Sequence, residues 1–145
     1  MPMRFLPTLL TVLLSALGTS AFAQSALEVD VVLNKSKAGG KVRVALCPGK
    51  VAYETEVGCT VNTVDATTGT VRVSFTDAPK GELGIKVFHD INGNGELDTN
   101  WMGIPTEPYG FGNSAPATFG PPSFEKAAVR FNGDRTVTRV TMVGG

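Results

Sequence analysis

The fold is decided first by one alternating run near the start of the chain, Leu27-Glu28-Val29-Asp30-Val31-Val32-Leu33. Every odd position in this run is apolar, and most even positions are polar. Because successive side chains of a β-strand point to opposite faces, the alternation predicts a strand with one buried face. The same period of two recurs at residues 41–46, 71–76, 83–87 and 127–131, whereas the β-branched segment 136–143 has no clear phase.

Glycine-containing turn sequences separate these runs, at residues 37–40, 67–69, 78–81 and 132–134. Asn132-Gly133 lies between two strand-like runs and predicts a β-hairpin. No window of ten or more residues after residue 23 shows a helical period. Short strands with frequent turns and no helices predict an all-β domain, an antiparallel β-sandwich of about seven strands.

The first 23 residues predict a cleavable signal peptide. Arg4 supplies a positive charge, residues 5–17 are mostly apolar, and Ala21 and Ala23 are small residues where a signal peptidase reads. The apolar stretch is shorter than the roughly 20 residues that a membrane-spanning helix needs. We therefore expect a periplasmic or secreted protein with one domain over residues 24–145, and an uncleaved anchor is the alternative.

The charge balance argues against two classes of partner. The chain has 13 Lys and Arg residues against 13 Asp and Glu residues. Cleavage of the signal peptide removes Arg4 and leaves the acids slightly in excess. Nucleic acids and anionic membranes bind a concentrated basic face. We therefore expect neither nucleic acid nor, after cleavage, a membrane as partner, and we expect an unidentified ligand or an envelope protein instead.

The two cysteines, Cys47 and Cys59, have a spacing that fits neither a zinc site nor a redox Cys-x-x-Cys motif. An oxidising compartment favours pairing of an even number of cysteines. Export therefore predicts a Cys47–Cys59 disulfide, with two buried thiols as the alternative.

Residues 88–124 form a long segment with little periodicity. Loops of this length in a compact domain are usually functional or disordered, and the aromatic residues and five prolines here favour an ordered one. It either covers an open end of the sandwich or forms a binding surface. Trp101, Tyr109, Phe111 and Phe119 could form a platform for a sugar or peptide, although aromatic side chains more often pack into a core.

Within this segment, side chains with the spacing of an EF-hand calcium loop are found at Asp90, Asn92, Asn94 and Asp98. Gly95 takes the sixth position, where the loop turns sharply, and the Glu96 carbonyl would be a further ligand. The twelfth position has Trp101 in place of the usual glutamate, so Glu107 would have to supply the missing carboxylate. The pattern predicts a calcium site, and a polar β-turn is the alternative.

The only histidine, His89, precedes Asp90. Together with Glu107 these residues suggest a hydrolase-like enzyme as an alternative function. However, no nearby serine lies in a nucleophile-elbow pattern, and nothing else marks a nucleophile. We therefore assign no catalytic residue and expect His89 to be structural.

Three stretches and one asparagine of this chain together resemble the bacterial family called domain of unknown function 2141. They are residues 89–98 (HDINGNGELD), residues 103–111 (GIPTEPYGF), Asn113 and residues 121–127 (PPSFEKA). Gly112 departs from the serine expected before Asn113. The resemblance implies an exported bacterial protein with an immunoglobulin-like or prealbumin-like β-sandwich, and it implies no established activity or catalytic residue.

These observations predict an exported, non-enzymatic binding or structural module whose 90–98 loop is stabilised by calcium. A periplasmic enzyme is one alternative. An accessory subunit of an envelope complex is another, and its sign would be an exposed aromatic patch near Tyr109 and Phe111.

Overall fold

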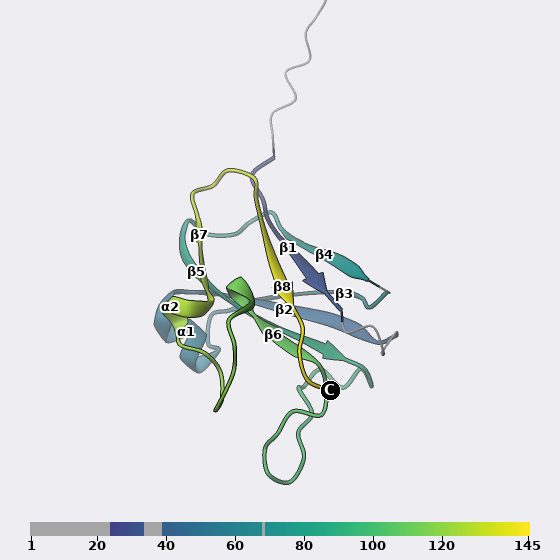
Figure 1. The fold of residues 1–145 in the computed structure, drawn as a ribbon. Helices are drawn as coiled ribbons and strands as arrows, with labels where there is room; N and C mark the ends of the chain where they lie inside the picture. Colours follow the sequence, from purple (N-terminus) through teal and green to yellow (C-terminus); the bar gives the residue numbers. More distant parts are fainter. Residues whose placement is uncertain (1–23, 34–38, 68) are drawn as a thin grey trace, which may run out of the picture.

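The computed structural model describes residues 24–33, 39–67 and 69–145, so the predicted signal peptide lies outside it. These residues form a β-sandwich that also contains short helices (Figure 1). The strands are β1 (Leu27–Val32), β2 (Lys41–Pro48), β3 (Thr60–Asp65), β4 (Thr70–Phe75), β5 (Gly81–Asp90), β6 (Tyr109–Phe111), β7 (Ala128–Phe131) and β8 (Thr136–Thr141). The helices are α1 (Gly49–Thr55), the 3-10 helix η1 (Gly112–Ser114) and α2 (Phe124–Ala127). In the described ranges, none of them has the length and hydropathy to cross a bilayer.

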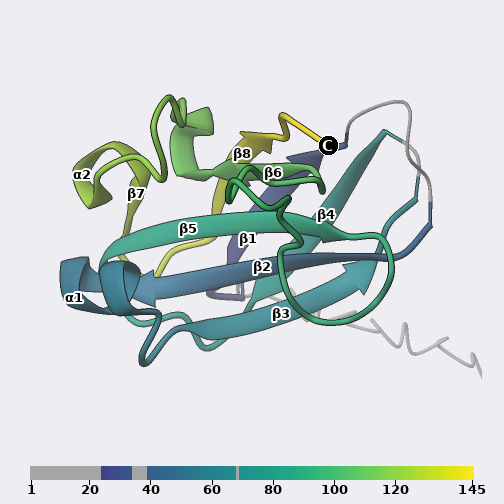
Figure 2. The same ribbon diagram turned by 90° about the horizontal axis from the view of Figure 1, so that it is seen from below.

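The strands form two sheets. The smaller has the order β4-β1-β8, and the larger has the order β3-β2-β5-β6, with β7 paired to the start of β5 (Figure 2). The predicted all-β sandwich is therefore confirmed. One pairing differs from the prediction, because β1 runs parallel to β8 while it runs antiparallel to β4.

The core lies between the two sheets and follows the alternation seen in the sequence. Apolar side chains of β1, β2 and β5 that face inward are almost completely buried, among them Val29, Val44 and Ile85. The ambiguous phase of β8 is resolved by its pairing, since Val140 is buried and Val137 is exposed. The face of the larger sheet that points away from the core is not covered by the smaller sheet and could form a binding site.

Two local expectations are wrong. Asn132-Gly133 does not close a hairpin, because β7 belongs to the larger sheet and β8 to the smaller one, so this turn carries the chain between sheets. The expectation of no helices also fails. Helix α1 has seven residues, too few for a helical period to stand out in the sequence, and tertiary contacts hold it.

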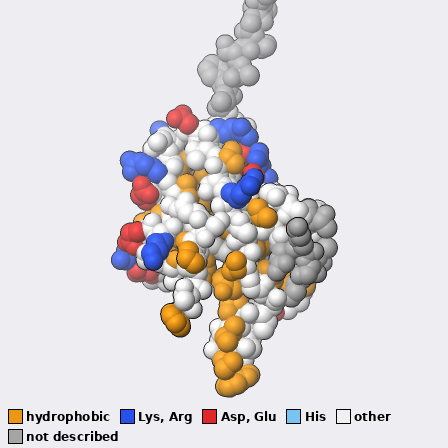
Figure 3. Space-filling model, viewed as in Figure 1, with side chains coloured by type: hydrophobic (Ala, Val, Ile, Leu, Met, Phe, Trp, Pro, Cys, Tyr) orange, Lys and Arg blue, Asp and Glu red, His pale blue; other side chains and the backbone are white. Residues whose placement is uncertain are grey.

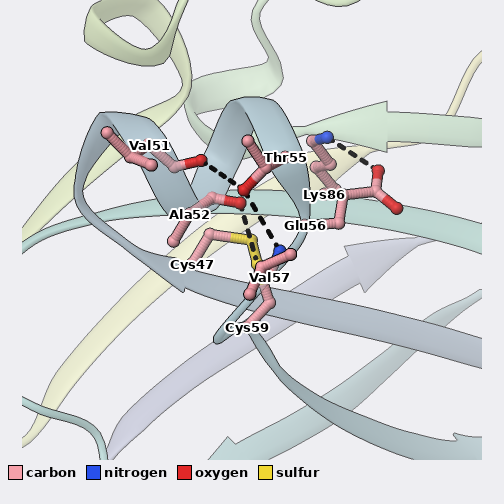
Figure 4. The surroundings of a disulfide bond; sticks show 8 residues. All are labelled: Cys47, Val51, Ala52, Thr55, Glu56, Val57, Cys59 and Lys86. Atoms are coloured by element: carbon pink, nitrogen blue, oxygen red, sulfur yellow. Dashed lines mark hydrogen bonds and ion pairs between the residues drawn. A yellow bond between two sulfur atoms is a disulfide. The ribbon is translucent and has the colours of Figure 1, made fainter.

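Helix α1 is fixed to the larger sheet by a covalent bond. Cys47 at the end of β2 and Cys59 before β3 form the predicted disulfide, which encloses the helix (Figure 4). Glu56 ends the helix in the left-handed conformation, with φ of 63°, and its N–H donates to the Ala52 carbonyl at 2.7 Å. The disulfide and this cap hold the chain between β2 and β3 in one place.

Tyr53 of α1 packs onto β5 where Gly84 leaves room for it. A Cβ atom on Gly84 would lie 2.5 Å from Cδ2 of Tyr53. The hydroxyl of this nearly buried tyrosine donates to the Pro122 carbonyl at 3.0 Å, and burial raises the pKa of Tyr53 to about 12. Helix α1 therefore anchors the segment before α2 to the larger sheet.

Removing the disulfide tests its contribution. The double variant Cys47→Ala/Cys59→Ala should lose about 3 kcal/mol of unfolding free energy, because the bond closes a short loop in the unfolded chain. Urea unfolding measures the loss, and the wild type in reductant is the matched control. A variant as stable as the oxidised wild type would contradict this assignment.

Candidate functional site

The loop between β5 and β6, residues 91–108, projects from one end of the sandwich (Figure 1). Backbone hydrogen bonds run along it. At its base, the His89 N–H donates to the Pro108 carbonyl at 2.8 Å. Further out, the Thr106 N–H donates to the Asp98 carbonyl at 2.8 Å, and the Asn100 N–H donates to the Ile104 carbonyl at 2.9 Å. The loop is shorter than the predicted segment 88–124, because β5 runs to Asp90 and β6 and η1 follow at residues 109–114, and it has regular internal structure.

The Asp90 carboxylate holds the first turn of this loop in place through hydrogen bonds, and we call residues 91–108 the braced loop. Its side chain is fully buried, and its oxygens accept the N–H of Gly93 at 2.7 Å and of Gly95 at 2.9 Å. The Arg43 Nε of β2 donates to the same carboxylate at 2.7 Å. Burial opposes ionisation, but Arg43 and the two backbone donors outweigh it and hold the pKa of Asp90 below its ordinary value of 3.8.

Glu107 braces the other side of the loop. It is 4% exposed, and its two oxygens accept the N–H of Ile91 at 2.7 Å and of Asp98 at 3.2 Å. Glu107 thus lies against the 90–98 segment, and its predicted role as the completing calcium ligand stays a prediction. In the structure it reaches backbone N–H groups there.

The predicted calcium ligands lie in one loop, but their side-chain oxygens already accept hydrogen bonds. The amide nitrogens of Asn92 and Asn94 donate to the Asp98 carboxylate at 2.6 and 2.8 Å. The amide oxygens of the two asparagines accept the N–H of Asn94 and of Glu96. No group of three acidic, histidine or cysteine side chains among the described residues is arranged to hold a metal. Calcium binding therefore stays a prediction.

His89 points into the core, on the opposite face of β5 from Asp90. It is fully buried, and its Nε2 lies 2.5 Å from the Gly39 carbonyl oxygen. Because a carbonyl only accepts hydrogen bonds, Nε2 carries a proton. Its Nδ1 is buried without a hydrogen-bond partner in the described part of the chain. This placement fits the expected structural role.

The predicted aromatic ligand surface divides into two parts. Trp101 is 91% exposed in the projecting loop, near the exposed Met102 and Ile104, and Figure 3 shows apolar side chains along this loop. Tyr109 and Phe111 instead lie on β6, with ring centroids 6.0 Å apart. The two parts therefore do not form one platform.

Tyr109 and Phe111 belong to a groove on the outer face of the larger sheet, with a volume of about 640 Å³. The strand register gives its floor two cross-strand rows. One row is Val61, Ala45, Lys86 and Phe111, and the other row contains Arg43, Phe88 and Tyr109. We call this feature the sheet groove.

Three segments wall the sheet groove. Glu56 and Cys59, next to the disulfide, lie at one side. Residues 95–97 of the braced loop lie at another, and Pro121 completes the lining. In Figure 2, which looks onto the larger sheet, the loop is drawn in front of β2 and β3. The hydrogen bonds that Asp90 accepts from Gly93 and Gly95 therefore fix the position of one wall of the groove.

The two cations of the floor differ in how they are paired. Lys86 Nζ lies 2.8 Å from Glu56 Oε1 and 4.8 Å from the centre of the Tyr53 ring (Figure 4 shows the Glu56 pair). Arg43 uses only its Nε, and neither of its Nη atoms makes a hydrogen bond to any described residue. Arg43 is therefore the cation of the floor whose Nη groups are available to donate hydrogen bonds to a ligand.

Sequence reasoning missed Arg43, Ala45 and Lys86. They occupy the polar phase of two predicted strands, so the alternation marks them only as facing away from the core. What makes them a site is the pairing of β2 with β5, which joins segments distant in sequence.

We predict that the loop holds its shape without metal. In a chelator, amide exchange at Gly93 and Gly95 should be slow in the wild type, because both N–H groups donate to Asp90. Asp90→Ala should remove this protection and lower the unfolding free energy by about 2–4 kcal/mol, since it leaves buried donors and the Arg43 charge unpaired. The matched control is Asp65→Ala, which removes an exposed partner of Lys41 and should cost under about 1 kcal/mol. Protection that appears only on adding calcium would contradict the prediction.

The Asp90 ion pair also predicts a pH dependence. A carboxyl whose pKa is lowered by folding stabilises the folded state above its ordinary pKa, and this stabilisation is lost as pH falls through the folded value. The difference in unfolding free energy between wild type and Asp90→Ala should therefore be constant near neutral pH and shrink below about pH 4. Denaturant unfolding over a pH series measures it, and a difference that grows on acidification would contradict the pairing.

A protein-family model covers most of this chain. The family model described as an uncharacterized protein conserved in bacteria (DUF2141) matches residues 29–139, from within β1 to within β8. Comparison with curated proteins and with solved structures gave no match. The matched range includes the sheet groove and the braced loop, and it confirms the resemblance found in the sequence. The chain therefore belongs to the DUF2141 family of bacterial proteins.

Proposed function

We propose that this chain is an exported, non-enzymatic module that binds a small ligand in the sheet groove. The observation that carries the proposal is the groove itself. Its volume of about 640 Å³ falls within the roughly 300–1,000 Å³ of small-molecule sites. Its floor combines apolar and aromatic side chains with few polar groups, which is the usual composition of such sites.

The groove is built on rigid elements, which favours binding without large rearrangement. Its floor consists of paired strands. One wall adjoins the Cys47–Cys59 disulfide, and another is held by the carboxylate of Asp90. A preformed site loses less conformational entropy when a ligand binds.

The groove also supports binding better than catalysis. His89 lies in the core, and both oxygens of Glu107 accept backbone N–H groups, so neither residue lines the groove. The carboxylate of Asp90 is similarly engaged. An enzyme that uses these three residues would have to rearrange the loop first.

A role as an envelope-complex subunit is the second candidate. The supporting observation is the exposed apolar cluster of Trp101, Met102 and Ile104, which lies in the projecting loop rather than near Tyr109 and Phe111. Exposed apolar patches often mark interaction sites. This surface is separate from the groove lining, so the two functions are compatible.

Binding in the groove is tested with isotope-labelled protein comprising residues 24–145. A panel of neutral and charged aromatic fragments at about 1 mM should shift the amide signals of groove residues first, because a suitable apolar pocket captures such fragments. Ala45→Phe places a ring on the groove floor and should abolish these shifts. Val137→Phe adds the same ring to an exposed position of β8 and is the matched control.

Shifts that survive in Ala45→Phe, or a panel that leaves the groove signals unchanged, would contradict the proposed function. Val137 lies outside both hydrophobic clusters, whereas Ala45 packs against the cluster that contains Cys47 and Phe111, so thermal melts check that Ala45→Phe remains folded.

A further inference from the structure

We propose that the sheet groove recognises a ligand with a carboxylate attached to an apolar body, and that Arg43 binds the carboxylate. This inference deepens the proposed function and rests on it. The guanidinium group is a planar fork that matches the two oxygens of a carboxylate. Arg43 has the geometry to act in this way.

Arg43 is held by one edge and free at the other. Its Nε donates to Asp90, which is itself fixed by the N–H groups of Gly93 and Gly95. The Arg43 side chain is 26% exposed and lines the groove, and its Nη atoms make no hydrogen bond to the described residues. Asp90 therefore orients the fork without occupying its outer donors.

The other charges of the groove leave Arg43 as the anion-binding group. Lys86 is paired with Glu56, so its charge is already balanced. Glu96 lies on the groove wall, and its side chain makes no hydrogen bond or ion pair with a described residue. Its negative charge weakens anion binding, so removing that charge should strengthen binding of a carboxylate ligand.

The apolar side chains of the groove floor indicate where the rest of the ligand would bind. Phe88 and Tyr109 follow Arg43 in one cross-strand row, while Val61 and Phe111 lie at the ends of the neighbouring row. A carboxylate at Arg43 thus leaves an apolar or aromatic body in contact with the aromatic side chains of the floor. Burial of that body would supply most of the affinity, and the fork would supply the selectivity.

The experiment compares matched acids and neutral analogues on protein comprising residues 24–145. The first pair is 4-phenylbutyrate and 4-phenylbutanol, and the second is a short acetylated peptide ending in phenylalanine and its C-terminal amide. Titration followed by amide shifts should give the acid of at least one pair about tenfold tighter binding, because only the acid receives two charge-assisted hydrogen bonds. The pair that shows the preference distinguishes a free organic acid from a peptide C-terminus.

Two variants assign the preference to its residues. Arg43→Lys keeps a positive charge beside Asp90 but removes the fork, so the acid should bind about tenfold more weakly while the neutral analogue is unaffected. Glu96→Gln should tighten acid binding about twofold and leave the neutral analogue unchanged. Thermal melts of both variants check that the loop remains folded.

Equal binding of acid and neutral analogue in the groove would overturn this inference and leave the proposed function standing. An acid preference that persists in Arg43→Lys and is insensitive to Glu96→Gln would also overturn it. If neither compound of either pair shifts the groove signals, the inference fails, and the fragment panel decides separately whether the groove binds ligands at all.

Discussion

The ion pair between the buried Asp90 and the half-buried Arg43 is the interaction on which the candidate site depends. It lies where β5 passes into the projecting loop, and it joins that loop to β2. A fully buried carboxylate is tolerated only when its charge and its lone pairs are satisfied, and here Arg43 and the N–H groups of Gly93 and Gly95 do so. The same contacts set the course of the loop and the orientation of the arginine.

The groove follows from this pair together with the disulfide at the other wall. Paired strands alone would present a nearly flat outer face. Residues 95–97 form one wall because the Gly95 N–H donates to the Asp90 carboxylate. The Cys47–Cys59 disulfide holds α1, and with it Glu56, at a second wall. A concave surface therefore arises from two constraints that belong to different parts of the chain.

The strands and turns of this arrangement could be predicted from local sequence patterns, whereas the pairing of distant strands could not. Alternation in residues 27–33 identified β1, since burial of one face leaves a period of two. The spacing of Asp90, Asn92 and Asn94 identified a special turn, but side chains that ligate a cation and side chains that accept backbone N–H groups have the same spacing. Asn132-Gly133 gave a turn without showing that it connects two sheets. The position of Arg43 beside the loop depends on strand register, which no local pattern contains.

The most direct measurement of the central claim is a carbon-detected NMR titration of the Asp90 carboxyl group in metal-free buffer. If Arg43 and the backbone donors of the loop stabilise the carboxylate, the midpoint should lie below 3.8. The N–H signals of Gly93 and Gly95 should shift with the same midpoint. A midpoint at or above 3.8, or one that falls below it only after calcium is added, would contradict the account.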